Sequence, residues 1–182
     1  MSDSLFVFKV IIAGDSGVGK TAAVARFVDG RFVSNTKSTI GVDFSLKNVN
    51  LPLDSDSKST IQVALQIWDV AGESRFRSIL PYYIAGTQGL ILAFDSTAPA
   101  TLGHLNEWLE VINLYLNEKI PTILIATKTD LPQKTIDQIN VKEFMNQNDI
   151  KSFFHTSSLN GENINNAFRA LTEIIARSKG LS

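Results

Sequence analysis

The chain carries near its start the stretch Gly14-Asp15-Ser16-Gly17-Val18-Gly19-Lys20-Thr21, which matches the phosphate-binding pattern G-x-x-x-x-G-K-[ST]. Its glycines let backbone N–H groups converge on phosphate oxygens without a Cβ in the way. Lys20 supplies a cation for the β- and γ-phosphates, and the Thr21 hydroxyl is a candidate Mg²⁺ ligand. The alternative is a glycine-rich turn that caps a helix. The context favours phosphate binding, because a buried strand over Phe6–Ala13 precedes the loop and a helix over Ala22–Val28 follows it.

Outward from this loop, short β-rich runs alternate with stretches of helical period. The runs predict strands over Phe6–Ala13, Val42–Leu51, Ile61–Val70, Leu90–Phe94, Thr122–Ala126 and Ser152–Thr156. Helical spacing on one face is seen at Leu105, Leu109, Ile112 and Leu116, and again at Ile164, Phe168, Leu171 and Ile175. The polar turn-formers of residues 52–59 predict a hairpin between the second and third strands. We therefore expect an α/β fold, a single P-loop NTPase domain over residues 1–182, whose mostly parallel six-stranded sheet has one antiparallel edge strand and helices on both faces.

Composition narrows the function classes. Of 182 residues, 44% are apolar and 19% charged, which is typical of a globular domain and argues against disorder. The net charge of −1 excludes a strongly basic nucleic-acid binder. The chain has no cysteine, which excludes disulfides, thiolate zinc sites and a prenyl or palmitoyl anchor on this chain. No apolar run is long enough to span a bilayer, so we expect a cytoplasmic protein.

Two further motifs stand at the ends of predicted strands. Asp69 ends one of them and can hold Mg²⁺ through water, while the N–H of Gly72 can come close to a γ-phosphate; D-x-x-G is otherwise an ordinary turn. Thr127-Lys128-Thr129-Asp130 follows the strand Thr122–Ala126. The carboxylate of Asp130 can accept from guanine N1–H and the 2-amino group, donors that adenine lacks there, and the stem of Lys128 can lie along the base. The alternative for this stretch is a surface loop.

The motifs GDSGVGKT, STIGVDF, IWDVAGE, TKTD and HTSSLNGENINNAF resemble, in order and spacing, those of the Ras-superfamily small GTPases over nearly the whole chain. STIGVDF and residues 75–83 most resemble the Rab branch. The resemblance implies that Thr21, Thr39 and Asp69 form the Mg²⁺ site, and that Phe32–Phe44 and Gly72–Tyr83 are switches ordered by GTP. It places the nucleotide on Asp15, Ser16, Gly17, Val18, Gly19, Lys20, Thr21, Ala22, Phe32, Thr39, Gly72, Thr127, Lys128, Asp130, Ser157, Ser158 and Leu159.

Several positions need comment beside this resemblance. Phe32 stands where the family places an aromatic against guanine, with ordinary core packing as the alternative. Ser157-Ser158-Leu159 corresponds to the family's S-A-K loop, whose amide reaches guanine O6, and Leu159 replaces its Lys. Thr127 replaces the more common Asn. Glu73 stands where most members have a catalytic Gln, and the segment from Trp68 to Tyr82 is one residue shorter than in the Rab pattern.

The expected function is a GTP-hydrolysing switch, in which Lys20, Thr39, Gly72 and Glu73 are the catalytic residues and Mg²⁺ is the cofactor. We expect a low intrinsic rate, because an ionised Glu73 can only accept hydrogen bonds and carries the charge of the phosphate it faces. A nucleotide-binding scaffold that hydrolyses GTP slowly or not at all is the alternative. An ATPase or nucleotide kinase is a third interpretation, which Asp130 disfavours.

The expected partners are GTP or GDP and the effectors and regulators that bind the switches. Phe44, Trp68 and Tyr83 flank the switches, where the Rab branch displays three aromatic residues; they could equally be core. We expect no nucleic-acid partner, no C-terminal lipidated tail and no direct membrane anchor, with recruitment to membranes through partners.

Overall fold

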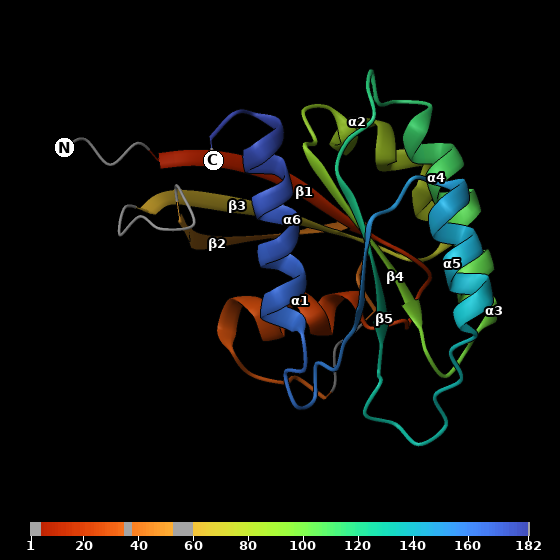
Figure 1. Ribbon diagram of the computed structural model, residues 1–182. Helices are drawn as coiled ribbons and strands as arrows, with labels where there is room; N and C mark the ends of the chain where they lie inside the picture. The colour runs from red at the N-terminus through yellow and green to blue at the C-terminus, as the bar shows by residue number, and fades with distance from the viewer. Residues whose placement is uncertain (1–4, 35–37, 53–59, 182) are drawn as a thin grey trace.

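The computed structural model describes residues 5–34, 38–52 and 60–181, which fold around one six-stranded sheet (Figure 1). The strand order is β2-β3-β1-β4-β5-β6, and every pairing is parallel except that of β2 with β3. The strands are β1 (Leu5–Ala13), β2 (Val42–Pro52), β3 (Thr60–Val70), β4 (Gly89–Asp95), β5 (Thr122–Thr127) and β6 (Ser152–His155). The helices are α1 (Lys20–Asp29), the 3₁₀ helix η1 (Ser74–Ile79), α2 (Leu80–Ile84), α3 (Ala100–Gly103), α4 (Leu105–Asn113), α5 (Gln138–Gln147) and α6 (Ile164–Ser178).

Helices cover both faces of the sheet, as Figure 1 shows. Helices α1 and α6 pack on one face, where the rings of Phe27 and Phe168 stack with centroids 4.2 Å apart. Helices α2, α3, α4 and α5 pack on the other face around the fully buried Trp108. Because the sheet is covered on both sides, its central strand β4 is buried along its whole length. The predicted α/β architecture is confirmed.

The predicted strands agree with the observed ones to within one residue at each end, and the predicted helix over Ala22–Val28 to within two. Helix α6 begins at Ile164 as the spacing predicts and ends at Ser178, three residues beyond Ile175. Leu116 shares the spacing of Leu105, Leu109 and Ile112, but α4 ends at Asn113. The N–H of Tyr115 donates to Ile112, three residues back, so the last turn tightens and the helix stops. Leu116 still packs against the core from the following loop. The hairpin of β2 and β3 is confirmed by a register that runs from Val42 opposite Val70 to Pro52 opposite Thr60. Of the turn predicted over residues 52–59, Pro52 is the last residue of β2 and residues 53–59 lie outside the described residues.

The parallel strands β1, β3, β4, β5 and β6 all end at the same edge of the sheet, so the loops that follow them meet there. These loops carry the motifs singled out in the sequence except STIGVDF, which enters the antiparallel strand β2 at the same edge, where Val42 lies opposite Val70. In the described part of the chain, no helix combines the length and the apolar composition needed to cross a membrane.

Candidate nucleotide and magnesium site

The side chain of Lys20, the first residue of α1, folds back over the backbone of the loop between β1 and α1. The Nζ of Lys20 donates to the carbonyl oxygens of Gly14, at 2.7 Å, and of Asp15, at 2.8 Å. Burial lowers the pKa of Lys20 to about 8, although the carboxylates of Asp69 and Asp15 act in the opposite direction. Lys20 is therefore mostly protonated at neutral pH and offers a buried positive charge to an anion in the loop.

Two glycines bring backbone segments closer together than a side chain would allow. A Cβ on Gly14, whose φ is +147°, would lie 2.1 Å from the carbonyl oxygen of Ala93 in β4. A Cβ on Gly72 would lie 2.1 Å from the N of Ser16 and 2.2 Å from the carbonyl carbon of Asp15. The segment that begins at Gly72 therefore rests directly on the phosphate-binding loop.

Three side chains with oxygen atoms that could bind a metal ion come from separate segments and meet at the start of α1. The Oγ1 of Thr21 lies 2.9 Å from the Oγ1 of Thr39 and donates to the Oδ2 of Asp69 at the end of β3. The other oxygen of Asp69 is buried and has no hydrogen-bond partner among the described residues. Burial raises the pKa of Asp69, while the hydrogen bond from Thr21 and the charge of Lys20 oppose this rise. Two hydroxyls and a carboxylate with a free oxygen are hard donors, so these residues fit Mg²⁺.

A cavity of about 350 Å³ lies at the ends of β5 and β6. Its lining includes Phe32, Lys128, Asp130, Ser158 and Leu159, which come from three different loops. Asp130 is half-buried, and Phe32 is 40% exposed, so Phe32 is not a core residue and the core interpretation of it is wrong. The cavity combines an aromatic wall, a carboxylate and backbone amides, which is the chemistry that a purine with both donors and acceptors requires.

The residues under this cavity are held by bonds to the phosphate-binding loop. The Oγ1 of the buried Thr127 contacts the carbonyl oxygen of Val18. The Nζ of Lys128 donates to the carbonyl oxygen of Gly17 at 2.8 Å and to the Oδ2 of Asp95 at 2.5 Å. Lys128 therefore lines the cavity with its ammonium group tied to the phosphate-binding loop and to Asp95. Asp95 is a supporting residue that sequence reasoning missed.

The carboxylate of Asp15 faces α4 instead of contributing to the loop's anion site. Its Oδ2 lies 2.5 Å from the Nδ1 of His104, and its Oδ1 accepts from the Nε1 of Trp108 at 3.1 Å. What Asp15 offers to the site is thus its backbone, while its side chain ties the loop to the far helix. No local pattern indicates this contact, because the two partners are 89 and 93 residues away along the chain.

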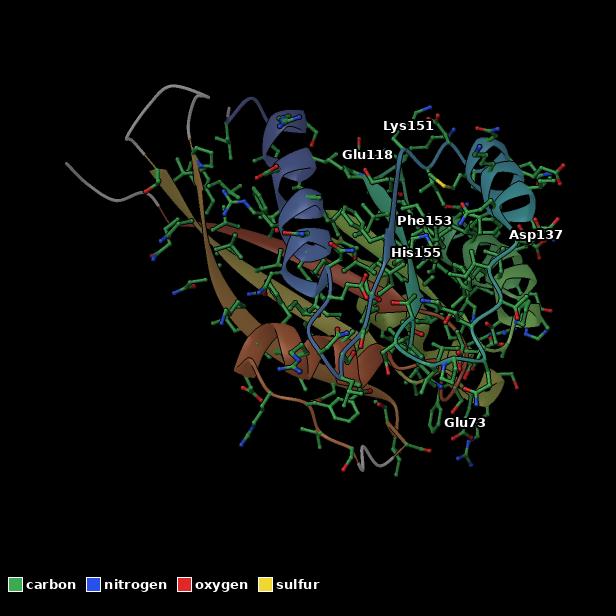
Figure 2. The ribbon with its side chains drawn as sticks, turned by 60° about the horizontal axis from the view of Figure 1, so that its bottom comes forward. Glu73, Glu118, Asp137, Lys151, Phe153 and His155 are labelled. Carbon is green, nitrogen blue, oxygen red and sulfur yellow. The ribbon has the colours of Figure 1, made fainter. Side chains whose placement is uncertain are left out.

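Glu73 points out of the molecule. Its Oε2 lies 2.8 Å from the Nε of Arg75, and the side chain of Arg75 is 69% exposed whereas that of Glu73 is 36% exposed. Figure 2 shows Glu73 at the margin of the molecule, at the end opposite to Glu118 and Lys151. The carboxylate of Glu73 is therefore engaged by Arg75 and not by the groups that hold Lys20 or Asp69.

The other predicted site residues fall into two groups. Those that belong to the phosphate-binding loop and the first turn of α1 are Ser16, Gly17, Val18, Gly19 and Ala22, of which Gly17, Gly19 and Ala22 also line the cavity at the ends of β5 and β6. Ser157 is fully buried, and its Oγ accepts from the N–H of Asn160 at 3.3 Å. Ser157 thus shapes the loop after β6 without lining the cavity.

Phe44, Trp68 and Tyr83 form one aromatic cluster beside the switch segments. The ring centroids of Phe44 and Trp68 are 5.2 Å apart, and those of Trp68 and Tyr83 are 5.6 Å apart. The Nζ of Lys9 lies 4.8 Å from the centroid of Trp68. Phe44 is 48% exposed, whereas Trp68 packs partly against the core. Trp68 thus connects the cluster to the core, while Phe44 presents its ring at the surface. The core interpretation is therefore wrong for Phe44.

Comparison with known proteins agrees with this geometry. The model of the Ras family matches residues 9–177 of the chain. Over 171 residues, the chain is 37% identical to the Ras-related protein RABD2b of Arabidopsis thaliana, and this match covers 93% of the chain and 81% of the relative.

Proposed function

Because this chain belongs to the Ras-superfamily small GTPases, in their Rab branch, and is therefore a GTPase with a single P-loop domain, we propose that its switching is carried out by the site described above. In this proposal Lys20 and the loop amides bind the β- and γ-phosphates. The cavity lined by Phe32, Lys128 and Asp130 takes the guanine. Thr39 and Gly72 meet the γ-phosphate, so that its loss on hydrolysis frees the two switch segments.

One observation carries the proposal: Thr39, from the first switch segment, meets Thr21, whose hydroxyl also contacts Asp69 at the end of β3. These three residues would hold Mg²⁺, which supplies positive charge to the phosphate oxygens when it is bound. Thr39 then links the first switch to the occupied site, and Gly72 links the second through its contact with Ser16. Both links depend on what the phosphate-binding loop holds.

The experiment is to identify the nucleotide that co-purifies with the protein and to measure its release with Mg²⁺ and with EDTA. We expect GDP, released faster in EDTA. We expect Thr21→Ala to release GDP as fast with Mg²⁺ as the parent does in EDTA, because it removes one of the three oxygen donors. The control is Thr60→Ala, which removes an exposed threonine at the far end of β3 and should behave as the parent. Tight retention of ATP, or a release rate indifferent to EDTA, would contradict the proposal.

A second candidate function is a scaffold that binds GTP but hydrolyses it very slowly. The pairing of Glu73 with Arg75 favours it, because the residue at the expected catalytic position is turned to solvent. Multiple-turnover phosphate release in Mg²⁺, with an exchange factor to relieve product inhibition by GDP, separates the two candidates. Repeated turnover supports the switch, and a single slow turnover supports the scaffold.

We propose membrane trafficking as the setting of this switch, on the strength of the Rab branch alone. Effectors and regulators would then read the switches through the cluster of Phe44, Trp68 and Tyr83, which couples an exposed aromatic ring to rings anchored in the core. Membrane recruitment would follow from those partners.

A further inference from the structure

The side chain of Arg26, on α1, holds the loop that follows β6 from outside the base cavity. Its Nε donates to the carbonyl oxygen of Ser158 at 2.7 Å, its Nη2 donates to that of Leu159, and its Nη1 donates to that of Gly30 at 2.8 Å. In the parts of the chain that the structure describes, Arg26 takes part in no ion pair. The planar guanidinium thus donates hydrogen bonds to three backbone carbonyl oxygens, two of them from consecutive residues.

The hydrogen bonds from Arg26 to Ser158 and Leu159 fix the direction of the backbone N–H groups in the loop after β6. A peptide unit is planar and trans, so the C=O of Ser158 and the N–H of Leu159 point in opposite directions. Since the C=O points to Arg26, the N–H of Leu159 points away from Arg26. Ser158 and Leu159 line the base cavity, whereas Arg26 lines a separate hollow beside Gly30 and Gly161. Among the described residues, neither the N–H of Ser158 nor that of Leu159 donates to a protein acceptor.

Free N–H donors held in one direction discriminate between purines. The O6 of guanine accepts a hydrogen bond, but adenine carries an amino group at that position, which would oppose the loop N–H with another donor. Taking the cavity as the guanine site, and so resting on the proposed function, we propose that Arg26 is a specificity-determining positioning residue. It reads no base itself, but it orients the loop amides that read O6.

A lysine cannot replace this role fully. An ammonium group on a flexible stem carries the same charge but lacks the rigid fork that holds two consecutive carbonyl oxygens at once. Arg26→Lys therefore keeps any general attraction for an anionic nucleotide and loses part of the loop orientation. This separates the proposed role from a simple charge effect.

The test compares three diphosphates in competition with a fluorescent GDP, after EDTA has removed the bound nucleotide. GDP carries all contacts, IDP lacks the 2-amino group that reports on Asp130, and 6-thio-GDP keeps N1–H but has a poorly accepting sulfur in place of O6. The variants are Arg26→Ala and Arg26→Lys. Arg177→Ala is the matched control, since Arg177 is an exposed arginine on α6.

We expect Arg26→Ala to weaken GDP and IDP by the same factor, about tenfold, as the loss of one oriented hydrogen bond to a buried acceptor implies. The loss for 6-thio-GDP should stay below about threefold. Arg26→Lys should fall between Arg26→Ala and the parent, and Arg177→Ala should match the parent.

An equal loss of affinity for all three nucleotides in Arg26→Ala would mean that Arg26 only stabilises the fold. Loss of the preference for GDP over IDP in this variant would mean that Arg26 acts through Asp130. Either result overturns the inference. A parent that does not distinguish GDP from IDP overturns the proposed guanine site as well, so the two failures are distinguishable. Thermal unfolding of each variant is measured in parallel. If Arg26→Ala does not fold, Arg26→Lys is judged by the same ratios.

Discussion

Replacing Glu73 by Gln should make intrinsic GTP hydrolysis faster. In the parent, the carboxylate pairs with Arg75 at 2.8 Å on the surface. Such an exposed pair is worth only about 0.5 kcal/mol, so it orients Glu73 without locking it in place. The larger obstacle is chemical: a carboxylate can accept a hydrogen bond from the attacking water but cannot donate one to the γ-phosphate, and it brings a negative charge to an anion. An amide accepts and donates without that charge.

The size of the effect follows from two terms. One well-placed donor in the transition state is worth on the order of 2 kcal/mol. Ordering a Gln side chain that stays partly exposed costs roughly 0.5 kcal/mol, the low end for an immobilised side chain. The difference, about 1.5 kcal/mol, corresponds to roughly a tenfold faster single turnover. The assay is single-turnover hydrolysis of GTP at saturating Mg²⁺.

Two further variants test the role assigned to Arg75. Arg75→Ala releases the Glu73 carboxylate but leaves it unable to donate, so we expect no acceleration. In the Glu73→Gln background, Arg75→Ala should change the rate by less than about twofold. Glu107→Gln is the matched control, because Glu107 also pairs with an arginine of η1, Arg77, at 2.7 Å and lies on α4. An unchanged rate in Glu73→Gln would place Glu73 outside the chemistry, and a slower one would make its carboxylate the general base.

Three other predictions address the base cavity, the aromatic cluster and acid stability. Asp130→Asn should shift preference from GDP to the xanthine nucleotide, whose C2 carbonyl can accept from the new amide; unchanged GDP affinity in a binding titration would contradict the assignment of Asp130. Phe44→Ala should weaken GTP-dependent capture of partner proteins with GDP affinity nearly intact, whereas loss of the folded state in thermal unfolding would argue for a core role. Burial alone would raise the pKa of Asp95, but hydrogen bonds from Lys128 and a neighbouring threonine lower it. Its contribution to stability is therefore present near neutral pH and lost as pH falls below roughly 4, so the melting temperature of Asp95→Asn should depend less on pH there than that of the parent.

The parts of the site that sequence patterns predicted are those whose chemistry needs residues close together in the chain. The phosphate-binding loop must leave a strand and enter a helix, and it must contain glycines where backbone amides converge, so it can be read from residues 14–21 alone. The sheet was predictable for a similar reason, since each strand is a short apolar run bounded by turn-formers. The end of α4 was not, because the tightening at Tyr115 that stops the helix leaves the apolar spacing up to Leu116 intact.

The supporting contacts could not be predicted, because they join residues that only the packed fold brings together. Asp15 meets Trp108 across 93 positions, and Arg26 meets Leu159 across 133. Trp108 and Arg26 each fit the pattern of the helix that carries them. Trp108 is a buried core residue of α4, and Arg26 is a half-buried residue of α1, so neither position stands out in the sequence.

Helix α4 does more than cover one face of the sheet, because its Trp108 contacts both the second switch segment and the phosphate-binding loop. The Cζ of Arg77, in the second switch segment, lies 4.9 Å from the ring centroid of Trp108. The indole N–H of Trp108 in turn donates to Asp15 in the phosphate-binding loop. A movement of η1 that removes Arg77 from this ring therefore exposes one face of the side chain that anchors the loop. Loop and second switch are thus in contact twice, directly through Gly72 and Ser16 and indirectly through Arg77, Trp108 and Asp15.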